Sequence, residues 1–272
     1  MGIFVIKEAM FYEKIGDYKV HCSLCAQSCK IAPGKRGFCG VRENRDGDLY
    51  SLIYGTVSSE AIDPIEKKPL YHFFPPGSYV YSVGSIGCNF RCKHCQNWSI
   101  SQVCLEDAYT KDIMPDELVE RAIYSGSQSI AWTYNEPTIW HEYTSESAKL
   151  AKEAGLGTIY VTNGYITPGP LRDIAPYLDA ANIDIKAFNE KFYHDVASAK
   201  LAPVLEASAL AKELGIHVEI TTLIIPGVND SLDELRELSK WVYNNLGPPD
   251  TPLHFTRFHP QYKMQDLAPL HP

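Results

Sequence analysis

From residue 78 onward, short apolar runs suited to buried strands alternate with stretches of helical pattern. The predicted strands are Tyr79–Val83, Ser129–Thr133, Thr158–Thr162, Ala181–Ile185, His217–Ile224 and Leu253–Arg257. The predicted helices are Pro115–Ser125, Thr138–Ala154, Pro170–Pro176, Pro203–Leu214 and Ser231–Leu246. Such alternation favours a parallel sheet covered by helices, and six units are fewer than a closed eight-strand barrel needs. The sequence therefore predicts an α/β fold, a partial (β/α)6 TIM-like barrel.

The section before this alternation has a different character. Residues 1–77 are rich in Cys, Gly and Pro, show little core-forming periodicity and end at the turn signal Pro75-Pro76-Gly77. A chain of 272 residues is long enough for one large domain or two smaller ones. We expect an irregular Cys-rich N-terminal extension over residues 1–77 and the partial barrel over residues 78–272.

Composition and charge argue against several classes of protein. Hydrophobic residues make up 45% and charged residues 21%, which is typical of globular chains and not of disordered ones. The net charge of −8 argues against a broadly basic surface for nucleic acid. No run approaches the ~18 apolar residues of a membrane-spanning helix, and the first residues lack the features of a signal peptide. We therefore expect no membrane partner and a cytoplasmic location.

The cysteines are confined to the first part of the chain. All eight precede residue 105: Cys22, Cys25, Cys29, Cys39, Cys88, Cys92, Cys95 and Cys104. In a reducing compartment such thiols are better metal ligands than disulfide partners. Seven of them fall into two tight groups, which predicts metal sites, whereas Cys104 stands apart as a buried or free thiol.

The group after the first predicted strand has the spacing C-x3-C-x2-C, formed by Cys88, Cys92 and Cys95. Three thiolates are one too few for a closed structural zinc site. A four-iron cluster held by three cysteines leaves one iron open to a substrate or cofactor. The residues therefore predict a reactive iron–sulfur cluster. The alternative is a zinc site that takes His94 or Cys104 as its fourth ligand.

Polar or glycine-containing segments follow the predicted strands. In barrels of this type the chemistry lies at the C-terminal ends of the strands. The segments at these ends are Cys88–Cys95, Tyr134–Thr138, Asn163–Gly164, Lys186, Pro226–Asp230 and His259. We expect them to form one shared active site.

Longer strings resemble a known family. The motif C-x3-C-x2-C after a first strand, followed by a partial barrel, is similar to the radical S-adenosylmethionine superfamily. The string CNFRCKHCQNW resembles the branch that includes the pyruvate formate-lyase activating enzyme. CSLCAQSC and GKRGFCGVREN in the N-terminal section resemble the AmmeMemoRadiSam-system radical enzymes. The resemblance covers nearly the whole chain.

The resemblance implies that Cys88, Cys92 and Cys95 are the catalytic cysteines and hold a [4Fe-4S] cluster. Its open iron then binds the amino and carboxylate groups of S-adenosylmethionine. One electron breaks the sulfonium carbon–sulfur bond and releases a 5′-deoxyadenosyl radical, which abstracts hydrogen from a substrate.

The resemblance also implies cofactor-binding residues near the cysteines and after the second strand. His94 fills the slot of an aromatic residue that packs near adenine, with Gln96 close behind. The family segment Gly-Gly-Glu-Pro appears here with Tyr134-Asn135 in place of the glycines, and Glu136 is retained. Glu136 or an exposed strand carbonyl would accept from the methionyl ammonium. The alternative is a helix entry at which Asn135 or Thr138 acts as a cap.

Three later strand ends carry further implied contacts. Asn163 lies in a Thr-Asn-Gly string like that of activating enzymes, and Asp184 and Lys186 lie in a string that resembles their Asp-Leu-Lys. Lys186 would pair with the methionyl carboxylate or with Asp184, unless it is simply a solvated residue. His259 resembles a histidine that lies near the ribose.

The N-terminal group, Cys22, Cys25, Cys29 and Cys39, supplies four thiols in eighteen residues, enough for a closed metal site. Zinc and an auxiliary iron–sulfur cluster both fit such a set. The spacing lacks the compact repeats of ferredoxin-like inserts, which favours zinc. The alternative is four reduced thiols without metal.

The sequence thus predicts a radical enzyme that cleaves S-adenosylmethionine, although no motif identifies its substrate. A glycyl-radical activase is the alternative among enzymes. A metal-binding interaction module, with the N-terminal cysteines as a zinc ribbon that contacts protein or RNA, is the alternative from another class. The expected partners are an electron donor such as ferredoxin or flavodoxin and, by family association, Memo-like and AMMECR-like proteins. Relatives usually continue beyond the equivalent of Pro272, so we expect a further C-terminal segment that covers the site or contacts a partner.

Overall fold

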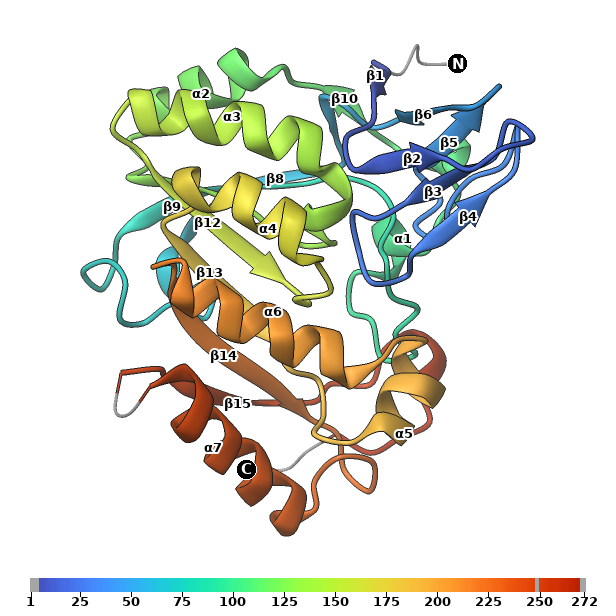
Figure 1. Cartoon of the computed structure of the whole chain (residues 1–272). Helices are drawn as coiled ribbons and strands as arrows, with labels where there is room; N and C mark the ends of the chain where they lie inside the picture. The colour runs from blue at the N-terminus through green and yellow to red at the C-terminus, as the bar shows by residue number, and fades with distance from the viewer. Residues whose placement is uncertain (1–4, 248–249, 270–272) are drawn as a thin grey trace.

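The structure, a computed structural model, describes residues 5–247 and 250–269. Its main body is a seven-stranded sheet in the order β15-β14-β13-β12-β11-β9-β8 (Figure 1). The strands of this sheet are β8 Ser59–Pro64, β9 Tyr79–Gly84, β11 Ser129–Trp132, β12 Gly157–Thr162, β13 Ala180–Asp184, β14 His217–Ile224 and β15 Leu253–Arg257. The six strands from β9 to β15 pair in parallel, and β8 pairs antiparallel with β9.

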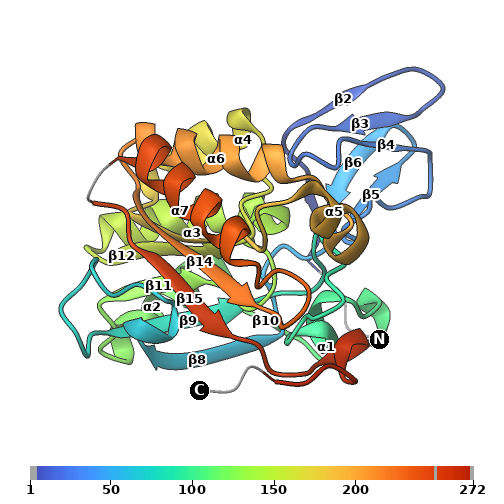
Figure 2. The same cartoon turned by 90° about the horizontal axis from the view of Figure 1, so that it is seen from below.

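Helices follow most of these strands, and α3, α4, α6 and α7 lie along one face of the sheet (Figure 2). The helices are α1 Trp98–Ser101, α2 Pro115–Tyr124, α3 His141–Glu153, α4 Pro168–Ile174, α5 Glu190–Phe192, α6 Leu201–Glu213 and α7 Leu232–Leu246. Proline at the first position of α2 and α4 suits a helix start, where its missing N–H leaves no bond unmade. The predicted α/β fold is confirmed. The first and last residues of each predicted strand lie within one residue of those observed.

The N-terminal section is more regular than expected. It forms short antiparallel sheets in the orders β1-β6-β5 and β2-β3-β4, and β7 pairs with β10. These strands are β1 Lys7–Glu8, β2 Tyr12–Lys14, β3 Val20–Cys22, β4 Cys29–Ile31, β5 Arg42–Arg45, β6 Asp48–Ser51, β7 Thr56–Val57 and β10 Lys111–Asp112. The sequence does not predict these strands, because strands of two to four residues carry almost no periodic signal.

The strand β8 changes the expected arrangement of the chain. It lies in the section described as an irregular extension, yet it forms one edge of the main sheet. The main sheet therefore begins before residue 78. β8 contains both exposed and buried residues because it is an edge strand, so its pattern resembles a loop.

The segment between β8 and β9 packs against the inside of the partial barrel. Ile65 and Leu70 pack there against small and apolar side chains of the central strands. The buried Glu219 of β14 accepts hydrogen bonds from the backbone N–H groups of Tyr71 (3.1 Å) and His72 (2.9 Å). This carboxylate fixes the segment inside the barrel.

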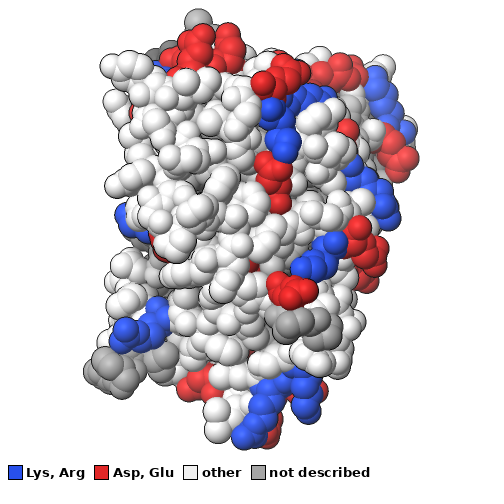
Figure 3. Space-filling model, turned by 90° about the vertical axis from the view of Figure 1, so that its left-hand side faces the viewer, with Lys and Arg blue, Asp and Glu red and all other residues white. Residues whose placement is uncertain are grey.

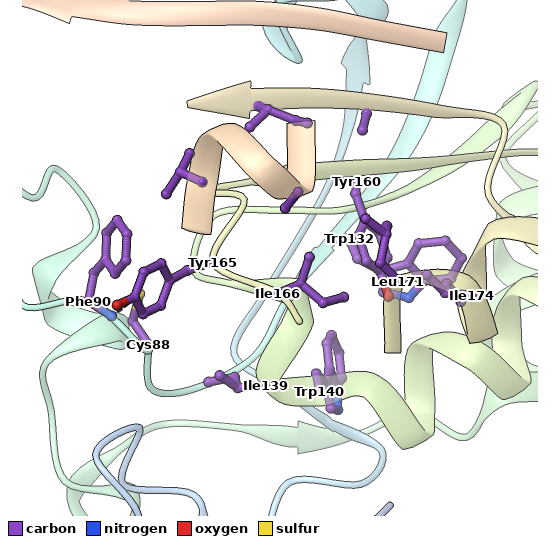
Figure 4. Close-up of a cluster of buried hydrophobic side chains, with 14 of the residues drawn as sticks. Cys88, Phe90, Trp132, Ile139, Trp140, Tyr160, Tyr165, Ile166, Leu171 and Ile174 are labelled. Atoms are coloured by element: carbon purple, nitrogen blue, oxygen red, sulfur yellow. Dashed lines mark hydrogen bonds between the residues drawn. The ribbon is translucent and has the colours of Figure 1, made fainter. Parts of the chain in front are cut away.

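A larger core lies between the sheet and its helices, and Figure 4 shows part of it. Trp140 stacks on Tyr143 with ring centroids 4.2 Å apart, and its Nε1 donates to the carbonyl of Ile53 at 2.6 Å. This contact joins the N-terminal section to the helical layer.

Two observations concern the surface and the helices. On the face in Figure 3, Lys and Arg residues lie beside Asp and Glu and form no extended basic patch. Within the described residues, no helix combines the length and the apolar character that crossing a membrane requires.

Candidate active site

The C-terminal ends of the parallel strands surround a cavity of about 310 Å³. This volume lies at the lower end of the range for small-molecule sites, roughly 300–1,000 Å³. Nine of the predicted barrel site residues line it: Cys88, Cys92, His94, Cys95, Gln96, Asn135, Asn163, Asp184 and Lys186. They come from four strand ends, which the parallel sheet brings to one edge.

The three cysteines lie in the loop that leaves β9. The sulfur of Cys88 accepts from the backbone N–H of Phe90 at 3.4 Å and lies 3.8 Å from Asn163 Nδ2. The sulfur of Cys95 lies 3.1 Å from Ser101 Oγ. Hydrogen-bond donors directed at sulfur stabilise the negative charge of a metal-bound thiolate.

Two of these thiols, Cys88 and Cys92, are poorly suited to ionise without a metal. Burial, and then the carboxylate of Glu136, raises the pKa of Cys88 well above its usual range. Burial raises the pKa of Cys92 to about 12. The positive charge of iron reverses such a shift, because a coordinated thiol gives up its proton.

Three cysteines within one loop are a donor set that suits an iron–sulfur cluster with one open iron. Across residues 5–247 and 250–269, no three His, Cys, Asp or Glu side chains form a group that could hold one metal ion. In a cluster each thiolate binds a different iron, so the sulfurs need not converge on one point. Cys88, Cys92 and Cys95 would hold three irons and leave the fourth open to the cavity. Cys104 is exposed and does not line the cavity.

Lys186 and Asp184 form an ion pair in the cavity wall, with Nζ 2.8 Å from Oδ2. The Lys186 side chain is only 16% exposed. Burial by itself would lower its pKa, but the Asp184 carboxylate and Cys92 raise that pKa overall. The backbone N–H of Lys186 donates to the hydroxyl of Tyr193 at 3.1 Å, which fixes the strand end. The cavity thus keeps a charged ammonium near the cysteines.

His94 is buried in the cavity wall, and its Nδ1 has no hydrogen-bond partner in the described part of the chain. Burial, followed by the positive charge of Lys186, lowers the pKa of His94 to about 3. Its ring is therefore neutral near pH 7. A neutral flat ring can pack against a nucleobase, as expected for the aromatic residue that usually fills this slot.

Two predicted residues do not reach the cavity. Glu136 is fully buried, and its carboxylate accepts from Thr138 N (3.0 Å), Thr162 Oγ1 (2.7 Å) and Asn163 N (2.8 Å). Its oxygens cap the turn at Pro137–Trp140 and join the ends of β11 and β12. Of the two acceptors predicted for the methionyl ammonium, Glu136 and an exposed strand carbonyl, only the strand carbonyl remains. His259 is exposed and does not line the cavity.

Lys67 and Lys68 line the cavity but were not among the predicted site residues, and Tyr134 was predicted only as part of the segment Tyr134–Thr138. The two lysines come from the segment between β8 and β9, and Tyr134 replaces a glycine of the family pattern. Lys68 is buried and pairs with Asp63 at 2.8 Å. The departure at Tyr134 was visible in the sequence, but nothing local indicated that residues 67 and 68 approach it.

Comparisons with known proteins identify the family. The sequence profile of the Radical SAM superfamily matches residues 83–241, more than half of the chain. An uncharacterized protein of Methanocaldococcus jannaschii is 49% identical over 264 residues, which span 97% of this chain and 78% of that protein. The pyruvate formate-lyase-activating enzyme of Clostridium pasteurianum is 24% identical over 168 residues, 58% of this chain and 67% of the enzyme.

The fold is shared with a solved structure. Streptococcus suis SuiB bound to S-adenosylmethionine matches with a TM-score of 0.54 and 13% identity, over 69% of this chain and 42% of SuiB. A likeness at this identity concerns the fold alone. The profile match, by contrast, runs from the strand before the cysteine loop through β14 and into α7. The chain belongs to the Radical SAM superfamily.

Proposed function

We propose that this chain cleaves S-adenosylmethionine reductively and uses the resulting 5′-deoxyadenosyl radical to activate or modify a substrate. The observation that carries this function is the meeting of three thiols, two of them buried, with a lysine ammonium whose side chain is 16% exposed, all in one cavity. A [4Fe-4S] cluster, when bound, supplies one electron and an open iron for the cofactor.

The residues of the chain then have separate tasks. Cys88, Cys92 and Cys95 bind the cluster, and Asn163 supports the sulfur of Cys88. Lys186 attracts the methionyl carboxylate, while carbonyls at the end of β11 accept from the ammonium. The neutral ring of His94 packs against adenine.

The test uses anaerobically purified protein and a variant with Cys88→Ala, Cys92→Ala and Cys95→Ala. The intact protein should be brown, and S-adenosylmethionine should change the low-temperature EPR spectrum of its reduced form. An unchanged spectrum of the reduced cluster in the variant, still perturbed by S-adenosylmethionine, would refute the assignment. A colourless protein without iron would favour the interaction module instead.

A glycyl-radical activase is the second candidate. It is favoured by the likeness to the Clostridium pasteurianum activating enzyme. Such an enzyme takes a hydrogen atom from a glycine of a protein substrate, so a glycyl radical should be detectable by EPR in a mixture with a glycyl-radical enzyme. Release of 5′-deoxyadenosine without that signal favours another substrate.

The partners remain proposals as well. Ferredoxin or flavodoxin is the proposed electron donor, and the strings CSLCAQSC and GKRGFCGVREN support an association with Memo-like and AMMECR-like proteins. Anaerobic mixing with each candidate, followed by 5′-deoxyadenosine release, tests these pairings. A true substrate should raise the release rate above that of the enzyme alone.

A further inference from the structure

A second group of thiols lies apart from the cavity at the strand ends. Cys22, Cys25, Cys29 and Cys39 all line one small cavity in the N-terminal section. Cys22 and Cys29 are cross-strand partners in β3 and β4, so their positions are fixed by the ladder. All but Cys29 are buried. The fold thus brings together four thiols that are spread over the sequence from Cys22 to Cys39.

A buried cation shares this cavity. Arg42 also lines it and is 1% exposed. Its Nη2 donates to the carbonyl of Met10 at 2.9 Å and to Glu142 Oε1. Its Nε and Nη1 have no hydrogen-bond partner among the described residues. Each buried donor left without an acceptor costs about 1–3 kcal/mol, so these groups require an explanation.

Neutral thiols explain the arrangement poorly, because S–H sulfur is a weak acceptor. Four thiolates around Zn²⁺ or a four-iron core would carry net negative charge, and their sulfurs would accept from a guanidinium. We propose that Cys22, Cys25, Cys29 and Cys39 hold a closed four-thiolate metal centre, with Arg42 donating to its sulfurs. This proposal does not depend on the reaction proposed above.

The present spacing of the thiols bears on which metal is bound. Among the described residues, no three His, Cys, Asp or Glu side chains form a group that could hold a single metal ion. This holds for the N-terminal cysteines and for the group of Cys88, Cys92 and Cys95. An iron–sulfur cluster tolerates wider spacing because its irons are separate, whereas zinc requires all four sulfurs to converge. Both metals give the same charge to the centre, and the experiment below distinguishes them.

The centre would lie against the loop that carries Cys88. Gln27 Nε2 donates to the carbonyl of Asn89 at 2.8 Å, and Cys25 forms a β-bridge with Ile166. Figure 4 shows Ile166 and Tyr165 in the same packed group as Cys88. A metal that fixes the N-terminal thiols would therefore also support one side of the Cys88 loop.

The decisive experiment isolates the second site. Full-length protein with Cys88→Ala, Cys92→Ala and Cys95→Ala is purified anaerobically, and its iron and zinc are measured. About four irons per chain identify an auxiliary cluster, and about one zinc identifies a structural ion. Either result supports the centre if adding Cys25→Ser and Cys39→Ser removes the metal while Cys104→Ser does not. Absence of both metals, or metal that persists after Cys25→Ser and Cys39→Ser, overturns the proposal.

The role of Arg42 has its own matched control. Arg42→Gln removes the guanidinium, and we expect the metal affinity to fall about 10- to 100-fold, as for other groups that hydrogen-bond to metal ligands. Glu142→Gln weakens the same ion pair but leaves the guanidinium beside the thiols, so it should change the affinity much less. Competition with a chelator measures both in folded protein. Equal losses in the two variants would show that Arg42 only pairs with Glu142.

Discussion

The hydroxyl of Tyr134 donates a hydrogen bond of 2.9 Å to Asp63 Oδ2, which joins the end of β11 to the edge strand β8. Tyr134 has a φ of +72°, in the left-handed region that bulky residues rarely adopt. Asp63 also accepts from Lys68 at 2.8 Å, and the Lys68 ammonium lies 4.7 Å from the centre of the Tyr134 ring. A buried polar cluster therefore holds Tyr134 in a conformation that glycine would adopt without strain.

Asp63→Asn should destabilise the protein by about 3–5 kcal/mol, because it leaves the buried ammonium of Lys68 without a counter-charge. Lys67 pairs with the same carboxylate at 3.1 Å, but its side chain is 68% exposed. Lys67→Met should therefore cost less than about 1 kcal/mol. Urea denaturation compares the two variants. Similar losses would show that Lys68 has other means of compensating its charge.

Lys186→Met should weaken S-adenosylmethionine binding about 10- to 150-fold, since a charged hydrogen bond contributes about 1.5–3 kcal/mol. Iron content should not change. Lys191→Met is the matched control, because Lys191 is an exposed residue paired with Asp195 outside the cavity. Calorimetry that finds less than a twofold change for Lys186→Met removes this residue from the cofactor site.

Gly87→Ala tests the contact between the Cys88 loop and the N-terminal section. Gly87 has a φ of +85°, and a Cβ there would lie 2.6 Å from the carbonyl oxygen of Cys39. Gly126 has a φ of +72° with nothing within 4 Å of an added Cβ. Gly126→Ala should cost about 1–2 kcal/mol from backbone strain, and Gly87→Ala about 1–3 kcal/mol more from overlap. Thermal unfolding measures both, and equal costs would mean that the two segments separate easily.

Glu219→Gln should make stability less dependent on pH in acid. Burial opposes ionisation of Glu219, but hydrogen bonds from His217, His254 and the backbone of Tyr71 and His72 lower its pKa from 4.5 to about 2. Because this pKa is lower in the folded state, its stabilisation is complete above pH 4.5 and is lost as pH falls towards 2. The difference in melting temperature between wild type and Glu219→Gln should shrink over that range. A constant difference would mean that the carboxylate contributes little charge-dependent stability.

The sequence by itself determined the parallel part of the sheet and most of the cavity wall. Strand and helix periodicity are local properties, so β14 and β15 have the predicted bounds. That Cys88, Cys92 and Cys95 line one cavity could be predicted because they lie within one loop. That Asn163 and Lys186 line the same cavity could be predicted because strand ends in a parallel sheet meet at one edge.

The tertiary structure alone decided which side chains face the cavity and which are used elsewhere. Glu136 lies at a strand end like its neighbours, but its carboxylate accepts hydrogen bonds from the backbone N–H groups of Asn163 and Thr138 and does not line the cavity. Asp63 and Tyr134 are 71 residues apart, and only the packing of β8 against β9 brings them together. Spacing along the chain encodes contacts within one element or loop, whereas contacts between distant segments depend on how the whole core packs.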